Sequence, residues 1–138
     1  MSWITPIYNR TESDVAYAKL LIDKIKNTGY DSLSVTEKSD WDSGLKGCRN
    51  ASDLNRIENN CEYLGNELDL ELDVKTDWDY DVTPLEQDIQ RICDNVSAIK
   101  EASGIETNPV PELPINNIYK LNTIEEILAL VYGSLQND

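Results

Sequence analysis

Apolar residues recur at helical spacing in three segments that resemble one another. In "DLNRIENNCEYLGN", residues 53–66, and in its near copy "DIQRICDNVSAIKE", residues 88–101, the apolar positions alternate at intervals of three and four. The segment "LNTIEEILALVYGSL", residues 121–135, follows the same rule. Such spacing places one apolar stripe along a helix. The pattern therefore predicts three helices that form an internal repeat, at 50–68, 84–102 and 118–136.

A fourth helix is predicted near the N-terminus, where Val15, Ala18, Ile22 and Ile25 follow the same spacing. A shorter helix is predicted over residues 36–45, because "TEKSDWDSGLKG" opens with threonine and closes on glycines. The fold class that follows is all-α, a bundle of about four amphipathic helices plus one short helix.

Capping residues predict where these helices begin and end. "TESD" at 11–14 and "NASD" at 50–53 each place a side-chain acceptor three residues before a carboxylate, which resembles a capping box. In "TPLE" at 83–86, Thr83 is the expected N-cap and Pro84 the first helical residue. The predicted helix ends are Gly29, the region of Gly65, and Gly104.

Two segments between the helices have another character. "ELDLELDV", residues 67–74, alternates acidic and aliphatic residues, which predicts an extended segment with one solvated face. It belongs to an acidic connector at about 67–81, where a single two-strand pairing is one alternative. The second, at about 107–114, has three prolines and predicts an extended linker. We expect one helical domain over 1–138, compact or elongated.

The three tryptophans are predicted to be packing residues. Trp3, Trp41 and Trp78 each come shortly before or within a helical segment. An enclosed tryptophan buries about 150–250 Å² of surface. We therefore expect each of them to close one end of the bundle.

The charge of the chain narrows the classes of ligand. The 138 residues carry a net charge of -14, and the 19 acids and five bases of residues 50–138 account for the whole excess. Residues 67–81 alone hold seven acids against Lys75. Because phosphate repels such a surface, no direct nucleic-acid ligand is expected.

The cysteines and the N-terminus indicate a protein made in a reducing compartment. The chain has an odd number of cysteines, Cys48, Cys61 and Cys93, and they lack the CxxC spacing of metal and redox sites. We therefore interpret them as free thiols in a protein made in a reducing cytoplasm. "MSWITPIYNR" has no apolar core of a signal peptide, and no stretch approaches the roughly 20 apolar residues that span a bilayer. We expect a soluble chain without a secretion signal.

The absence of histidine argues against catalysis. The chain has no histidine, the side chain best suited to acid and base chemistry near neutral pH. Carboxylate pairs could still act on a glycan, and the candidates are Asp53 with Glu58 and Asp88 with Asp94. However, Asp53 and Asp88 fall at predicted helix starts, where carboxylates cap amides. We therefore expect no enzyme and no cofactor.

One segment has the spacing of a calcium loop. In "DWDYDVTPLEQD", residues 77–88, the candidate ligands Asp77, Asp79 and Asp81 occupy positions one, three and five, and Asp88 occupies position twelve. Position six is valine where an EF-hand needs glycine, and aspartate at position twelve lacks the reach of glutamate. The segment is thus a weak calcium candidate, and no metal site is predicted.

The repeat also carries two pairs of polar residues beside its apolar stripe. Arg56 and Asn60 in the first copy match Arg91 and Asn95 in the second. Arginine can pair with the aspartate three residues before it, and asparagine can bond the backbone of a neighbouring loop. We interpret the four as a recurrent structural contact, and the alternative is a shared docking surface for a partner chain.

Several short motifs stand out along the chain. They are "SWITP" at 2–6, "VKTDW" at 74–78, "DIQRICDNVSAI" at 88–99, and an N-A-x-D-x-N-R-I-x-x-N-x-x-Y-L helix, which is matched by Asn50, Ala51, Asp53, Asn55, Arg56, Ile57, Asn60, Tyr63 and Leu64. Together they resemble a group of small structural proteins encoded among the tail genes of phages and prophages of Firmicutes. The chain departs from the pattern at "VKTDW", which here lies between the two copies, and at residues 11–47.

The resemblance implies a virion component of the tail tip, baseplate or fibre region, which acts as an adaptor in assembly. Its expected partners are other virion proteins and further copies of itself, with no direct contact to nucleic acid or membrane. It would be synthesised in the bacterial cytoplasm and located in the virion tail. Two alternatives remain open, an acidic DNA mimic or other inhibitor of a host protein, and a small carboxylate-dependent glycan hydrolase.

Overall fold

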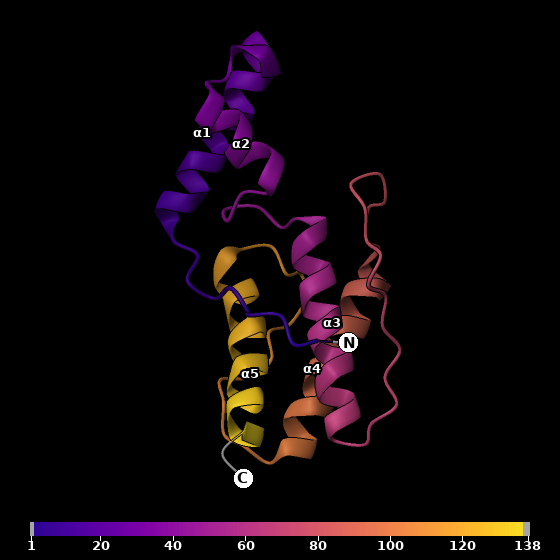
Figure 1. The fold of residues 1–138 in the computed structure, drawn as a ribbon. Helices are drawn as coiled ribbons and strands as arrows, with labels where there is room; N and C mark the ends of the chain where they lie inside the picture. The colour runs from indigo at the N-terminus through magenta and orange to yellow at the C-terminus, as the bar shows by residue number, and fades with distance from the viewer. Residues whose placement is uncertain (1, 137–138) are drawn as a thin grey trace.

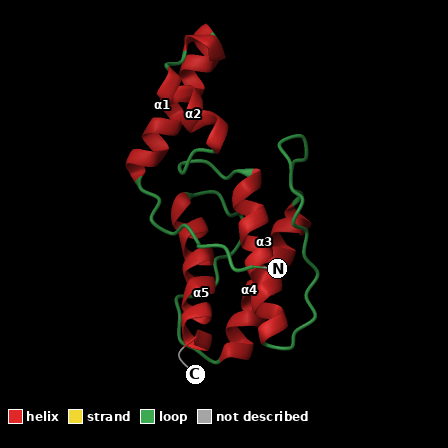
Figure 2. Cartoon of the chain, viewed as in Figure 1, coloured by secondary structure: helices red, strands yellow, loops and turns green. Residues whose placement is uncertain are grey.

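The computed structural model describes residues 2–136 and is all-helical over that range. Figure 2 shows helices joined by loops, with no strand in the part described. The prediction of an all-α helical bundle is therefore confirmed. In chain order the elements are α1 Glu12–Thr28, η1 Tyr30–Ser32, α2 Val35–Ser43, α3 Ala51–Glu67, α4 Glu86–Ser103 and α5 Ile118–Gln136.

The three helices of the internal repeat form one bundle. Figure 1 shows that α3, α4 and α5 run in the same direction, each starting at the end near α2 and ending near the C-terminus. Consecutive helices can run in the same direction only if the connector between them returns along the length of the bundle. Residues 68–85 and 104–117 are these two extended returns.

The predicted apolar stripes of the repeat meet in a single core. Ile57, Leu64, Val96, Ile99 and Val131 are each no more than 1% exposed. Every helix of the bundle supplies residues at intervals of three and four, so each turns one face inward. The stripes of the three copies are thus satisfied within one chain.

The fourth predicted helix, α1, does not join this core. It pairs with α2 in a hairpin that extends beyond the bundle (Figure 1), and the hairpin has a separate small core of Ala18, Leu21, Leu33 and Leu45. Trp41 lies within α2 and packs against this second core. Trp41 is therefore a packing residue, as predicted, but it packs on the hairpin core and not at an end of the main bundle, because its helix lies on α1.

A close backbone contact holds the base of the hairpin. Gly47, in the loop between α2 and α3, lies so near the start of α1 that an added Cβ would be 2.3 Å from the carbonyl oxygen of Asp14. A side chain at this position would have to displace backbone. Glycine therefore allows the loop to cross α1 here.

The acidic segment after α3 is extended but unpaired. Leu68, Leu70, Leu72 and Val74 pack on the main core, while the acids between them are exposed, as the alternation predicts. No strand pairs with this segment among residues 2–136, so the two-strand alternative was wrong. Gly65 makes room for the return, because an added Cβ would lie 2.9 Å from Leu72 Cδ1.

The helix starts follow the predicted caps in two places. Thr11 and Asp14 form the capping box of α1, with Thr11 N donating to Asp14 Oδ2 at 2.8 Å. At α3, Asn50 N donates to Asp53 Oδ2 at 2.8 Å, while the Asn50 amide turns back to the Leu45 carbonyl oxygen. The predicted N-caps therefore stand at both starts.

Two other starts differ from the prediction. The short helix begins one residue earlier than expected, at Val35, because Ser34 and Glu37 form its capping box. The start of α4 lies beyond Thr83 and Pro84, at Glu86. Thr83 is not the N-cap, since Asp88 Oδ2 accepts the Leu85 N–H at 2.8 Å and sets the first turn there.

The predicted glycine stops hold at two helices. Gly29 ends α1 with φ 85° and Gly104 ends α4 in the left-handed conformation, whereas α3 continues through Gly65 to Glu67. No helix within residues 2–136 combines the length and the apolar character needed to cross a membrane.

Candidate functional site

Two extended segments are each hydrogen-bonded to a pair of helices, whose side chains hold the backbone of the segment. We call the facing polar side chains of such a helix pair a groove. We call residues 3–10 strap 1 and residues 73–78 strap 2. Strap 1 is bonded to α3 and α5, and strap 2 is bonded to α3 and α4. Figure 1 shows both passing alongside the bundle. These grooves contain the polar residues that the repeat singled out.

Asparagine amides hold strap 1 by its backbone. Asn122 of α5 accepts the Arg10 N–H at 3.2 Å and donates to the Arg10 carbonyl at 3.0 Å. Asn60 of α3 does the same for Ile4, at 3.0 and 2.8 Å. An amide that bonds both groups of one residue replaces the two bonds that a neighbouring strand would make.

Strap 2 is held in the same way, by α3 and α4 in place of α5 and α3. Asn55 of α3 accepts the Trp78 N–H at 2.6 Å and donates to its carbonyl at 3.0 Å. Asn95 of α4 donates to the carbonyl oxygen of Asp73 at 2.8 Å. Asn55 and Asn122 thus perform one task at corresponding positions of two repeats.

A buried glutamate follows each of these asparagines by three residues. Glu125 accepts the Ile7 N–H at 3.1 Å, and its other oxygen accepts Nη2 of Arg10 at 2.6 Å. Glu58 accepts the Lys75 N–H at 2.9 Å, and its other oxygen accepts Nε1 of Trp78. In both straps the glutamate therefore bonds one backbone amide and the side chain of the residue three positions later.

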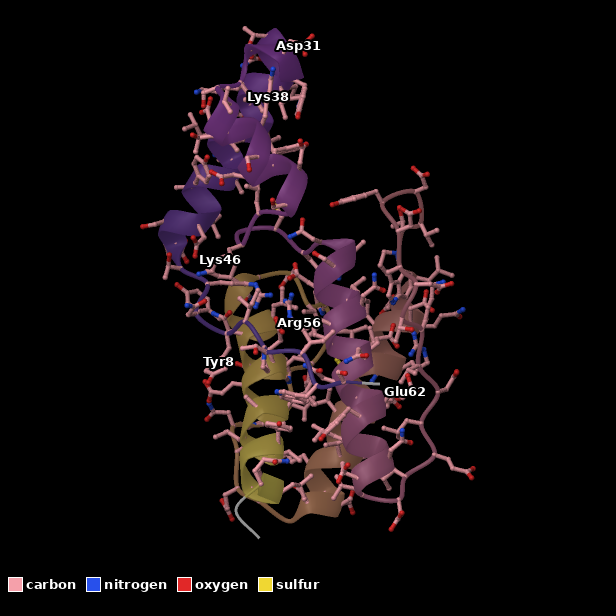
Figure 3. The ribbon with its side chains drawn as sticks, viewed as in Figure 1. Tyr8, Asp31, Lys38, Lys46, Arg56 and Glu62 are labelled. Atoms are coloured by element: carbon pink, nitrogen blue, oxygen red, sulfur yellow. The ribbon has the colours of Figure 1, made fainter. Side chains whose placement is uncertain are left out.

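An arginine from the next helix around the bundle completes each groove. Arg56 of α3 donates to both oxygens of Glu125, at 2.6 and 2.8 Å. Arg91 of α4 donates to both oxygens of Glu58 and also to the carbonyl of Asp73. Figure 3 shows Arg56 pointing from α3 toward α5. The two grooves share one recognition geometry, an Asn-x-x-Glu on one helix and an Arg-x-x-x-Asn on its neighbour.

Strap 1 adds a second ion pair and so buries four charges. Asp53 accepts from Arg10 at 3.2 Å and from Arg56 at 2.6 Å, which joins the two arginines to Asp53 and Glu125 in a neutral cluster. The side chains of Arg10 and Glu125 are 0% and 1% exposed. Buried pairs of this kind add little net stability compared with apolar packing, but removing one partner is costly because it leaves an uncompensated charge.

The Arg56 guanidinium is favoured in its charged form within the cluster. Burial alone lowers the pKa of Arg56, but the bonds and charges of Glu125 and Asp53 outweigh it, and the pKa is raised on balance. Within residues 2–136, the Arg10 Nε is the one buried side-chain nitrogen or oxygen with no hydrogen-bond partner. The cluster therefore satisfies every carboxylate oxygen that it buries and leaves one donor unused.

The third helix pair of the bundle, α4 and α5, has no such polar set. The register of the repeat places Gln90 and Cys93 where Asn55 and Glu58 stand, and Thr123 and Ile127 where Arg56 and Asn60 stand. Cys93 and Ile127 are buried among apolar neighbours. The Asn-x-x-Glu and Arg-x-x-x-Asn residues thus occur together only in the two grooves that hold a strap.

Aromatic rings fix the first residues of strap 1. The Trp3 ring stacks on Tyr132 of α5, with centroids 4.1 Å apart and planes 3° apart. Tyr63 of α3 approaches both rings at 5.8 Å. Trp3 and Trp78 therefore pack against the main core as predicted, one on each strap.

The structure divides the four polar residues that the sequence singled out between the two straps, with Arg56 and Asn60 at strap 1 and Arg91 and Asn95 at strap 2. Asn60 and Asn95 bond the backbone of neighbouring segments, as expected, and Arg56 pairs with Asp53 three residues before it. Arg91 differs, because it pairs with Glu58 of α3 and not with Asp88. All four are recurrent structural contacts, and none is left to form a free docking surface.

The carboxylates considered for catalysis are held by other groups. Asp53 and Glu58 belong to two different grooves, and each is bound by arginine. Asp88 caps α4, and Asp94 accepts a hydrogen bond from Gln90 at 2.9 Å. All four candidate carboxylates therefore have hydrogen-bond partners within the chain.

Two aspartates of the weak calcium candidate, Asp77 and Asp88, are held by other groups. Asp77 pairs with Lys75 at 2.7 Å, which lowers the pKa of Asp77 through the hydrogen bond and charge of the lysine. Asp88 is occupied at the start of α4, away from Asp79 and Asp81 in the exposed loop. In the part of the chain that the structure describes, no group of three or more acidic, cysteine or histidine residues could hold a metal.

Sequence reasoning missed half of the groove residues. It did not single out Arg10, Asn122 or Glu125, it named Asn55 only as part of the helix motif, and it considered Glu58 only for catalysis. A signal existed, because "LNRIE" at 54–58 and "LNTIE" at 121–125 are near copies that share the asparagine and the glutamate. The shared asparagine and glutamate lie on the helix face that binds the strap.

Comparison with protein-family models, with curated proteins and with solved structures finds no match.

Proposed function

We propose that the chain is a non-enzymatic structural or adaptor protein of a phage or prophage virion, in the tail tip, baseplate or fibre region. The observation that carries the proposal is the repeated strap groove. Its polar residues form their hydrogen bonds with the straps of the same chain, and so fix the path of the backbone. The repeat is thus a device for building a defined shape, as an assembly component requires.

The energetics of the grooves support a scaffolding role. A buried carboxylate that is bonded by arginine and by strap amides strongly penalises any shift of the strap, because a shift would leave charges unpaired. Glu58 and Glu125 impose this penalty on both straps. Positional accuracy of this kind suits a part that must fit its neighbours.

The location in a tail is supported by the resemblance of the repeated helix and of "VKTDW" to tail-associated proteins. In this chain the residues that carry the resemblance are groove residues. Asn55, Arg56 and Asn60 come from the helix motif, and Lys75 and Trp78 come from "VKTDW". We infer that the shared motifs encode the strap grooves.

The test is to purify particles from the host that carries the gene and to measure the protein by quantitative mass spectrometry. We expect a fixed number of copies per particle that survives high-salt washing. Its reproducible absence from intact particles in which other tail proteins are found would overturn the tail assignment. Release of soluble fragments from host-wall glycan by the purified chain would overturn the non-enzymatic part.

A further inference from the structure

The loop between strap 2 and α4 exposes large apolar side chains to solvent. Tyr80 is 73% exposed, Leu85 is 59% exposed and Val82 is 48% exposed. A single exposed apolar residue is ordinary, but three within six residues form a patch, and such patches mark interaction surfaces. The loop is therefore the first place to look for a partner.

A cleft lies between this loop and the base of the hairpin. Its volume is about 400 Å³, and it is lined by Trp41, Asp42, Leu45, Cys48, Asn50 and Tyr80. A smaller cavity of about 200 Å³ adjoins it and is lined in part by Arg49 and by Val82, Thr83 and Pro84 of the loop. The cleft thus separates two units with separate cores, with Trp41 and Leu45 on the hairpin side and Tyr80 on the bundle side.

The charges beside the cleft are mainly acidic. Asp42 lies in its wall, and Asp79 flanks Tyr80 and lines the adjoining cavity. From residue 76 to residue 90 the chain has five acids and no base, and Lys75 before them is paired with Asp77. Arg49 is the single base among the lining residues of the two cavities. A partner of complementary charge is basic.

We propose that this cleft is the docking site for another protein of the particle. The occupant is a segment that inserts one large apolar side chain between Trp41 and Tyr80 and places lysine or arginine on either side of it, toward Asp42, Asp79 and Asp81. The apolar side chain supplies the buried contact, and the basic residues select the segment and its orientation. This inference rests on the proposed function, because it names the surface by which the adaptor holds its neighbour.

The experiment titrates the full chain with fluorescent synthetic peptides tiled across the other proteins of the purified particle. The peptides that bind should contain an apolar residue flanked by lysine or arginine. Tyr80→Ala should weaken their binding at least tenfold, because a central aromatic contact is lost. Asp79→Asn with Asp81→Asn should weaken it severalfold and reduce its dependence on salt.

The variants are chosen so that folding is not in question. Tyr80 and Val82 are exposed, and asparagine at 79 retains the acceptor for the Tyr80 N–H. Trp41 is left unchanged because it packs on the hairpin core. The matched control is Tyr8→Ala, a half-exposed tyrosine on the other side of the bundle (Figure 3), and it should bind as the unchanged chain does.

Three results would overturn the docking site. They are binding that Tyr80→Ala does not alter, binding only to acidic or uncharged peptides, and no binding to any peptide of the particle. Counting copies per particle separates this failure from that of the proposed function. If the Tyr80→Ala chain enters particles as well as the unchanged chain does, the docking site is wrong and the tail assignment stands. If the unchanged chain is itself absent, the tail assignment is wrong.

Discussion

Glu58 and Glu125 occupy corresponding positions of α3 and α5, and each accepts a backbone N–H from a strap together with an arginine from the neighbouring helix. The two residues lie in helices whose echo is visible in the sequence as "LNRIE" and "LNTIE". Their equivalence means that the chain solves one structural problem twice. In each case a polar helix face fixes an extended segment that has no strand to pair with.

Replacing Glu125 should destabilise the protein strongly. Glu125→Gln keeps the shape but removes the charge that balances Arg10 and Arg56, and it turns an amide donor toward one of them. We expect a loss of about 3–5 kcal/mol in the free energy of unfolding, measured by urea denaturation. The adjacent Glu126→Gln, which is half-buried, is the control and should change stability by no more than about 0.5 kcal/mol. Equal effects of the two changes would contradict the role of the cluster.

Removing one asparagine should loosen one strap and leave the other in place. Asn122→Ala deletes both bonds to the Arg10 backbone, and Asn55→Ala deletes both bonds to Trp78. Each change should cost about 1–3 kcal/mol, since a backbone N–H and carbonyl lose their partners. Hydrogen exchange followed by mass spectrometry should rise in strap 1 for the first variant and in strap 2 for the second.

The two asparagine changes should also be additive, because the bonds that they delete have no residue in common. The exposed Asn116→Ala is the control and should leave exchange in both straps unaltered. Faster exchange in both straps from either single change would show that the grooves are not independent.

Two glycines should respond in opposite ways to an added methyl group. Gly47→Ala would force a Cβ to within 2.3 Å of the Asp14 carbonyl oxygen, so the hairpin base must shift at a cost of about 1–3 kcal/mol. Gly133 lies within α5, and apart from its chain neighbours and the nearby backbone of its own helix no atom lies within 4 Å of the corresponding position, so Gly133→Ala should stabilise by about 0.5–1 kcal/mol. Thermal unfolding of the two variants measures both signs, and a neutral Gly47→Ala would contradict the close contact.

The hairpin contains a tyrosine that should ionise late. The Tyr17 hydroxyl donates to Asp40 at 2.6 Å, and this bond, together with desolvation and the charge of Asp40, raises the pKa of Tyr17 from 10.0 to about 12. Because the folded pKa lies above the unfolded value, the contact stabilises fully below pH 10 and is lost as pH rises through about 12.

The titration can be followed by ultraviolet absorbance, comparing the unchanged chain with Asp40→Asn. We expect one tyrosine to shift toward its ordinary pKa in the variant, while Tyr17→Phe removes the ionisation near pH 12. An identical titration of Asp40→Asn and the unchanged chain would rule out the bond in solution.

Local features of the sequence predicted the helices well because their causes are local. The capping box at Thr11, the glycine stop at Gly104 and the 3,4 spacing of Leu54 to Leu64 each depend on residues within one or two turns. The wrong prediction of Thr83 as the N-cap of α4 also has a local cause. Asp88 captured the Leu85 N–H and began α4 three residues after the expected N-cap.

The groove residues were harder to predict because their partners are distant in the chain. Arg10 is bonded to a glutamate 115 residues away, and nothing near Arg10 in the sequence marks that partner. Asn60 and Asn95 could be recognised as a recurrent backbone contact, since they repeat. Which backbone they hold depends on how the connectors return, and periodicity does not report that.

The sequence by itself determined that the protein is helical, where most of its helices start and stop, and that residues 68–74 alternate between the core and solvent. Only the tertiary structure decided that three stripes share one core while α1 packs on α2, since all four stripes have the same spacing. It also decided that Arg10, Asp53, Arg56 and Glu125 form one neutral cluster. The physical reason is that an apolar stripe can pack against any other apolar stripe, whereas a buried charge is stable only beside a specific partner of opposite charge.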